Sequence, residues 1–261
     1  PEFKIPERSV HRIRDHVEQL IGRRYSGAYG MLAWQTLSRV TCDFNIAALA
    51  EWSWNGSGRD EQAFATAWAR RSGFSDPERV GRWAALIGPI EFDAYDSDFP
   101  FCYSWGQAID MVDRRERPVL GEGMFRYYLD TADFERKKAV CAEALALVSD
   151  EECTNLAHET DVVRSYVCLA ECIYEVAETV AVGDIRAASI QTRLLEAVTA
   201  LEQAGADNAA AIRTWRTGLG PEPWHYRVHD AIGATERTVA EITRIVHERH
   251  ILLPSGSRVA P

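Results

Sequence analysis

The sequence predicts a mainly α protein, built as a helical bundle-like domain that follows a short N-terminal α/β unit. Apolar residues recur at helical spacing through almost all of the chain after Gly58. The segments between these runs are short and rich in turn-forming residues, which favours antiparallel neighbours. With 261 residues, of which 46% are hydrophobic and 26% charged, the chain has ordinary globular composition and enough length for a substantial core.

The predicted α/β unit covers residues 1–59. Apolar residues from Val10 to Ile21 share one helical face, and this helix should end near Arg24, before a Tyr-Ser-Gly turn. The next segment, 27–34, is a short apolar run bounded by glycine, which is typical of a buried strand.

Residues 44–54 are ambiguous by pattern. Their alanines and leucine favour a helix, whereas Trp52 and Trp54 alternate as they would in a strand. We favour a helix that breaks at Asn55 and Gly56, because glycine after asparagine is a common helix stop.

The second predicted unit is a helical domain over residues 60–253, followed by a disordered tail over 254–261. Residues 88–103 carry aromatic, acidic and proline residues without periodicity, and they predict a structured loop. Within the long central helix, apolar residues from Leu156 to Val180 recur near the spacing of a bundle seam. The predicted helices of this domain are 60–72, 77–87, 104–116, 132–149, 155–182, 185–204, 207–217 and 224–250.

Composition excludes several function classes. A net charge of -10 without a basic stripe argues against a nucleic-acid partner. The apolar runs are far shorter than the roughly 20 residues of a membrane-spanning helix, and the first residues do not read as a signal peptide, so we expect a soluble chain. The six cysteines include no Cys-x-x-Cys pair, and they point only weakly to a reducing, cytoplasmic compartment.

The segment 44–59 is the strongest functional signal, because it places two tryptophans beside a carboxylate, an amide and a guanidinium. Aromatic rings can stack on the C–H face of a sugar, and charged or amide groups can hold its hydroxyls. We therefore predict a carbohydrate-binding wall in which Trp34, Trp52 and Trp54 stack on the ligand. The predicted hydrogen-bonding residues are Glu51, Asn55 and Arg59.

A second polar-aromatic cluster contains Tyr103 and Trp105, and it also could rim a saccharide cleft. His225 and His229 are four residues apart, but the glutamate of a His-Glu-x-x-His zinc site is missing, so we predict no metal. No phosphate-binding loop or dinucleotide fingerprint occurs, and we predict no cofactor.

Residues 45–55 read Asn-Ile-Ala-Ala-Leu-Ala-Glu-Trp-Ser-Trp-Asn, and they lie between a predicted strand ending at Trp34 and a predicted helix opening at Asp60. This arrangement resembles the end of the catalytic barrel in hexosaminidase-like glycoside hydrolases of families 20 and 84. In family 84 a helical domain follows that barrel. The resemblance implies that the α/β unit is the last unit of a TIM barrel and that this chain is the C-terminal portion of a larger protein. It implies an N-acetylhexosamine-containing carbohydrate and an upstream catalytic barrel as partners. The paired acids of the family lie upstream, so we expect this chain alone to be inactive.

Three other interpretations stay open at this level. The tryptophans can be core residues that seal the seam between two units, and Arg59 can simply pair with Glu51. The chain can be a non-catalytic helical domain for protein interaction or assembly. It can also be an independent hydrolase that uses acids from the predicted loop at residues 91–98.

Overall fold

The computed structural model describes residues 6, 8–26, 39–97, 105–182, 184–218 and 231–251, and within these ranges every regular element is helical. The mainly α prediction is therefore confirmed. The predicted strand at 27–34 and the tail at 254–261 lie outside the described residues. The elements are α1 (Val10–Gly22), α2 (Arg39–Trp54), α3 (Glu61–Arg71), α4 (Pro77–Asp96), α5 (Gly106–Arg114), η1 (Gly123–Phe125), α6 (Ala132–Leu147), η2 (Glu151–Cys153), α7 (Thr154–Ala181), α8 (Ala188–Gly218), α9 (Ala231–Ile245) and the π-helical turn η3 (Val246–His250).

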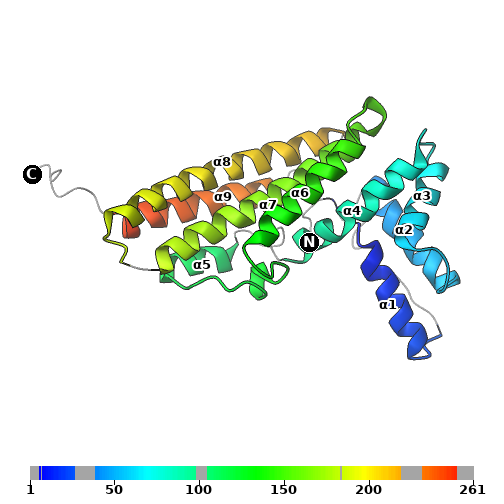
Figure 1. Ribbon diagram of the computed structural model, residues 1–261, viewed down its shortest axis with the longest axis horizontal. Coiled ribbons are helices and arrows are strands. Elements are labelled where there is room, and N and C mark those ends of the chain that lie inside the picture. Colours follow the sequence, from blue (N-terminus) through cyan, green and yellow to red (C-terminus); the bar gives the residue numbers. More distant parts are fainter. Residues whose placement is uncertain are drawn as a thin grey trace, which may run out of the picture.

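The long helices form an elongated bundle, from which the N-terminal helices project at one end (Figure 1). In the bundle α7 packs on both α6 and α8, and α8 packs on α9. Helix α4 packs against α6 and α7 on the bundle side and against α3 on the other. Helix α1 packs mainly on α2. Helix α4 lies between the N-terminal helices α1, α2 and α3 and most of the bundle.

Helix α7 is the centre of the bundle, and its predicted seam from Leu156 to Val180 is buried. Burial of this many aliphatic side chains is the main stabilising contribution in such a fold. Polar side chains fix how the helices line up. The amide of Asn208 on α8 donates to Ser165 Oγ on α7 at 2.9 Å, and Thr235 Oγ1 on α9 donates to Asn208 Oδ1 at 2.8 Å. These three residues link three helices inside the core.

Helix α4 corrects the prediction of a loop from residue 88. The helix continues through Pro89 to Asp96, because Ile87, Ile90 and Ala94 still bury one face against the bundle. A proline removes one helical hydrogen bond, but packing outweighs that cost here. Gly88 allows a close approach at this point, since an added Cβ would lie 3.0 Å from the backbone oxygen of Arg8.

Helix α8 corrects a second prediction, that of a break between residues 204 and 207. The helix is continuous, and Gly205 lies where α9 approaches closely. A Cβ at Gly205 would lie 2.7 Å from Cγ2 of Val239. This glycine therefore serves helix packing rather than helix termination.

Candidate functional site

The C-terminal end of α2 carries most of the predicted site, and it separates the two tryptophans. Successive helical residues turn by about 100°, so Trp52 and Trp54 point to nearly opposite sides. Trp52 is 0% exposed, its ring lies 5.1 Å from that of Phe64, and its Nε1 donates to the backbone oxygen of Arg59 at 3.0 Å. The predicted stacking role of Trp52 is therefore wrong for this structure, because no face of its indole is open. The core interpretation holds for this residue.

Trp54 has the opposite environment, because its side chain is 93% exposed. Asn55 follows it directly and is also exposed. An indole this exposed is unusual on a protein surface, because it leaves a large apolar area in contact with water. Of the predicted aromatic residues that the structure describes, Trp54 alone presents its ring to solvent.

Glu51 and Arg59 flank the same helix end and pair with each other. Arg59 Nη1 donates to Glu51 Oε1 at 2.7 Å, and the Arg59 side chain is 48% exposed. The alternative interpretation of a Glu51–Arg59 pair is thus confirmed. Each group keeps further hydrogen-bonding capacity, because one guanidinium nitrogen and one carboxylate oxygen make this contact.

Two more exposed apolar side chains lie at and just after the C-terminal end of α1. The C-terminal end of α1 contacts the turn after α2, where Ile21 lies against Gly56. Ile21 is 54% exposed and Tyr25 is 61% exposed. We call the residues Ile21, Tyr25, Trp54 and Asn55, with the Glu51–Arg59 pair, the tip; Figure 1 shows α1 and α2 projecting away from the bundle here.

The second predicted cluster is not supported as a rim. Trp105 is 3% exposed, and its backbone N–H donates to Thr238 Oγ1 at 2.8 Å in the core, so its predicted contact with a ligand is wrong for this structure. Trp34 and Tyr103 lie outside the described residues, as do His225 and His229. Their predicted roles stay predictions.

A cluster that the sequence analysis missed lies where α1, α4 and the segment after η1 meet. Its centre is Phe92, with the His11 ring 5.5 Å away, the Tyr127 ring 5.9 Å away and the Arg12 guanidinium carbon 4.7 Å from the ring centroid. The Tyr127 hydroxyl donates to Asp96 Oδ2. We call His11, Arg12, Phe92, Asp96 and Tyr127 the Phe92 cluster.

Burial shifts the pKa of several groups in and beside the Phe92 cluster. The pKa of His11 is lowered, first by burial and then by the positive charge of Arg12. The pKa of Asp93 is raised by burial, although Lys137 forms an ion pair with it. Burial and the hydrogen bond to Asp96 raise the pKa of Tyr127 to about 12. Groups with perturbed pKa values often mark functional sites.

This cluster was missed because residues 88–103 were predicted as a loop. Once α4 continues to Asp96, Phe92 and Asp96 are one turn apart on the same helical face. The signal that would reveal them is their spacing of four residues. Proline at position 89 obscured that signal, since an internal proline normally predicts a helix end.

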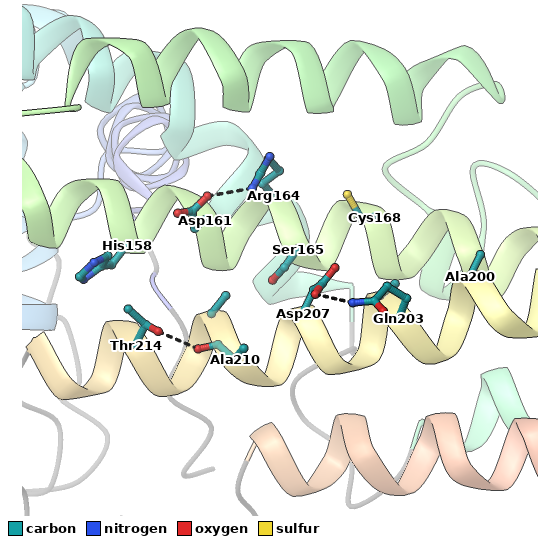
Figure 2. A pocket seen from close by; sticks show the side chains of 12 residues that line it. His158, Asp161, Arg164, Ser165, Cys168, Ala200, Gln203, Asp207, Ala210 and Thr214 are labelled. Atoms are coloured by element: carbon teal, nitrogen blue, oxygen red, sulfur yellow. Dashed lines mark hydrogen bonds and ion pairs between the residues drawn. The ribbon is translucent and has the colours of Figure 1, made fainter.

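A shallow groove of about 650 Å³ runs between α7 and α8 (Figure 2). Two pairs of its polar side chains bond to each other: Arg164 pairs with Asp161 at 3.1 Å, and Gln203 donates to Asp207 at 2.9 Å. The buried Nδ1 of His158, which also lines the groove, makes no hydrogen bond to any described residue. Burial raises the pKa of Cys168, which lowers the fraction of its thiol present as the reactive thiolate. The thiol of this groove is therefore poorly suited to act as a nucleophile.

Burial also raises the pKa of the other cysteines whose side chains the structure describes: that of Cys141 to about 12, and those of Cys153 and Cys172 to about 11. Asp150, Glu152 and Cys153 lie close enough together to share a metal ion. Both carboxylates are engaged by the protein, Asp150 with Arg79 and the Cys153 N–H, and Glu152 with the backbone and hydroxyl of Ser75.

Comparisons of the chain with protein-family models, with curated proteins and with solved structures find no match. Among the described helices, none has the length and apolar character needed to cross a membrane.

Proposed function

We propose that this chain is the C-terminal part of a glycoside-hydrolase-like protein and that its tip contributes a carbohydrate subsite. The observation that carries this proposal is the 93% exposed indole of Trp54 beside hydrogen-bonding side chains. The resemblance of residues 45–55 to the end of a hexosaminidase-like barrel supports the same ligand class. The ligand would be a sugar such as an N-acetylhexosamine.

The chemistry of the subsite follows from three kinds of group. The Trp54 ring offers an apolar face for the C–H side of a pyranose. Asn55 can donate and accept hydrogen bonds, and the Glu51–Arg59 pair can hold adjacent hydroxyls by charge-assisted bonds. This role needs no cofactor. Hydrolysis would be carried out by a catalytic barrel upstream, so this chain binds rather than reacts.

The test is an NMR titration of the indole N–H signals with N-acetylglucosamine and with a panel of neutral sugars. The Trp54 signal is identified by its loss in Trp54→Phe. We expect N-acetylglucosamine to shift the Trp54 signal and Trp54→Ala to abolish binding. Leu129→Ala is the matched control, because Leu129 is 81% exposed on a segment distant from α2 in the chain. A spectrum unchanged by every sugar would refute the proposal.

A non-catalytic interaction or assembly domain is the second candidate, and one observation favours it. Ile46, Ala50 and Trp54 are all exposed and follow each other at four-residue spacing on α2. Such a stripe is typical of a helix that packs on another protein surface. If assembly is the function, light scattering should show association that depends on concentration, and Ile46→Asp should abolish it.

A further inference from the structure

Arg12 combines a half-buried cation with the lack of an ionic partner. Its Nε atom is buried and makes no hydrogen bond, and no ion pair joins the guanidinium to any residue that the structure describes. Its contact is with the Phe92 ring, 4.7 Å away. Burying part of a cation without an anion costs free energy, so such a group is a natural receptor for a bound anion.

The neighbouring charges do not supply that anion. Asp93 forms an ion pair with Lys137, and Asp96 lies 3.5 Å from Arg126 and accepts from Tyr127. Neither carboxylate forms an ion pair with Arg12, although burial raises the pKa of Asp93 and the Arg12 charge partly offsets that rise. Among the described residues, no carboxylate therefore binds the Arg12 guanidinium directly.

We propose that the Phe92 cluster is a binding site for a small hydroxy-carboxylate, with Arg12 as the receptor for the carboxylate. A guanidinium presents paired N–H donors that match a carboxylate, and the aromatic ring behind it keeps the fork in place. The Tyr127 hydroxyl with Asp96, and the imidazole of His11, are placed around the same ring and suit hydroxyl groups. Among carbohydrates the matching class is a hexuronic acid. This site is separate from the tip and does not depend on its function.

The experiment titrates the full chain with D-glucuronate, D-glucose and acetate, and follows the arginine Nε–H and tyrosine signals by NMR. The Arg12 signal is assigned by its loss in Arg12→Met, which keeps an apolar stem on Phe92. We expect glucuronate to shift the Arg12 and Tyr127 signals, glucose to shift neither, and acetate to bind more weakly than glucuronate. In Arg12→Met glucuronate affinity should fall at least about tenfold, the loss expected for one charge-assisted contact.

Arg14→Met is the matched control, since Arg14 lies on the same helix but pairs with Glu18 and Glu61. It should bind glucuronate as the unchanged chain does. Tyr127→Phe keeps the ring and removes the hydroxyl, so it should weaken glucuronate binding and leave acetate binding unchanged. The proposal is overturned if glucuronate leaves the Arg12 signal unshifted, if binding survives in Arg12→Met while circular dichroism shows an intact fold, or if Arg14→Met loses binding equally.

Discussion

Arg8 and Arg12 are four residues apart, and both place a guanidinium over an aromatic ring, yet their environments differ. Arg8 is 8% exposed and makes two hydrogen bonds to Glu159 on α7, at 2.6 and 3.1 Å. Its guanidinium carbon lies 4.6 Å from the Phe44 ring and 4.8 Å from the Trp83 ring. Arg12 has one such ring and no ion pair with any described residue.

The difference shows that a carboxylate, rather than an aromatic cage, decides what a buried arginine does. Burial alone lowers the pKa of Arg8, but the charges of Glu159 and Glu91 more than offset it and the pKa is raised. Arg8 is therefore a completed structural contact, which joins the segment before α1 to α2, α4 and α7. Arg12 is left with binding capacity that the described part of the chain does not use.

The largest expected effect comes from removing Arg8. Arg8→Met leaves Glu159 buried without its cation, which should lower the free energy of unfolding by about 3–5 kcal/mol. Arg12→Met removes a charge that forms no ion pair with a described residue and keeps an apolar stem beside Phe92, so we expect a change within about 0.5 kcal/mol. Urea denaturation of both variants measures the contrast.

The double variant Arg8→Met with Glu159→Leu sharpens this prediction. Replacing both members of a buried ion pair by apolar residues is often nearly neutral, so the double variant should recover most of the loss. If the double variant is as unstable as Arg8→Met, the penalty comes from lost packing on Phe44 and Trp83, and the electrostatic explanation fails.

The two tryptophans of α2 are likewise identical residues in different environments, one buried and one exposed. Trp52→Ala should cost about 3–5 kcal/mol, because it leaves a cavity beside Phe64. Trp54→Ala should change stability by less than about 0.5 kcal/mol, since the ring touches mainly solvent. Thermal unfolding followed by circular dichroism compares them, and a large loss in Trp54→Ala would show that this ring is covered in solution.

Asn208 is expected to have an intermediate effect. Asn208→Ala leaves buried Ser165 and Thr235 without their shared partner, and this should cost about 1–3 kcal/mol. Leu195→Ala on the exposed side of α8 is the control, since Leu195 is 44% exposed and should matter less. Equal losses in the two variants in urea would show that the buried network adds nothing beyond packing.

The contrasts between Arg8 and Arg12 and between Trp52 and Trp54 mark the limit of what the sequence predicts. Helical periodicity was sufficient for the α class and for the α7 seam, because burial follows a 3.6-residue repeat. It was insufficient for Trp52 and Trp54, whose environments depend on Phe64 and on the path of the chain after α2. Glu159 is 151 residues from Arg8, and no local pattern indicates that the two meet. Pro89 likewise hid the face of α4 that carries Phe92.

The smallest expected effect concerns His11, whose pKa is lowered by burial and by the charge of Arg12. The folded state disfavours the protonated imidazole, so the unfolded chain binds more protons as pH falls through the ordinary histidine pKa of about 6.5. His11 therefore makes the fold less stable at pH 5 than at pH 7, and His11→Gln should reduce that difference. Burial also lowers the pKa of His250, so His250 destabilises the fold at low pH in the same way. It is present in both the unchanged chain and His11→Gln, so part of the pH dependence remains in the variant.

The link to Arg12 can be measured directly from the His11 ring proton, titrated by NMR. In Arg12→Met the pKa of His11 should rise, because one of the two causes that lower it has been removed. In Arg14→Met the pKa of His11 should change less, because in the unchanged chain the charge of Arg14 is paired with Glu18 and Glu61. An unchanged His11 titration in Arg12→Met would mean that the Arg12 charge is fully screened by water. A guanidinium screened to that degree would gain little from binding an anion. Arg12 would then differ from Arg8 only in how deeply it is buried.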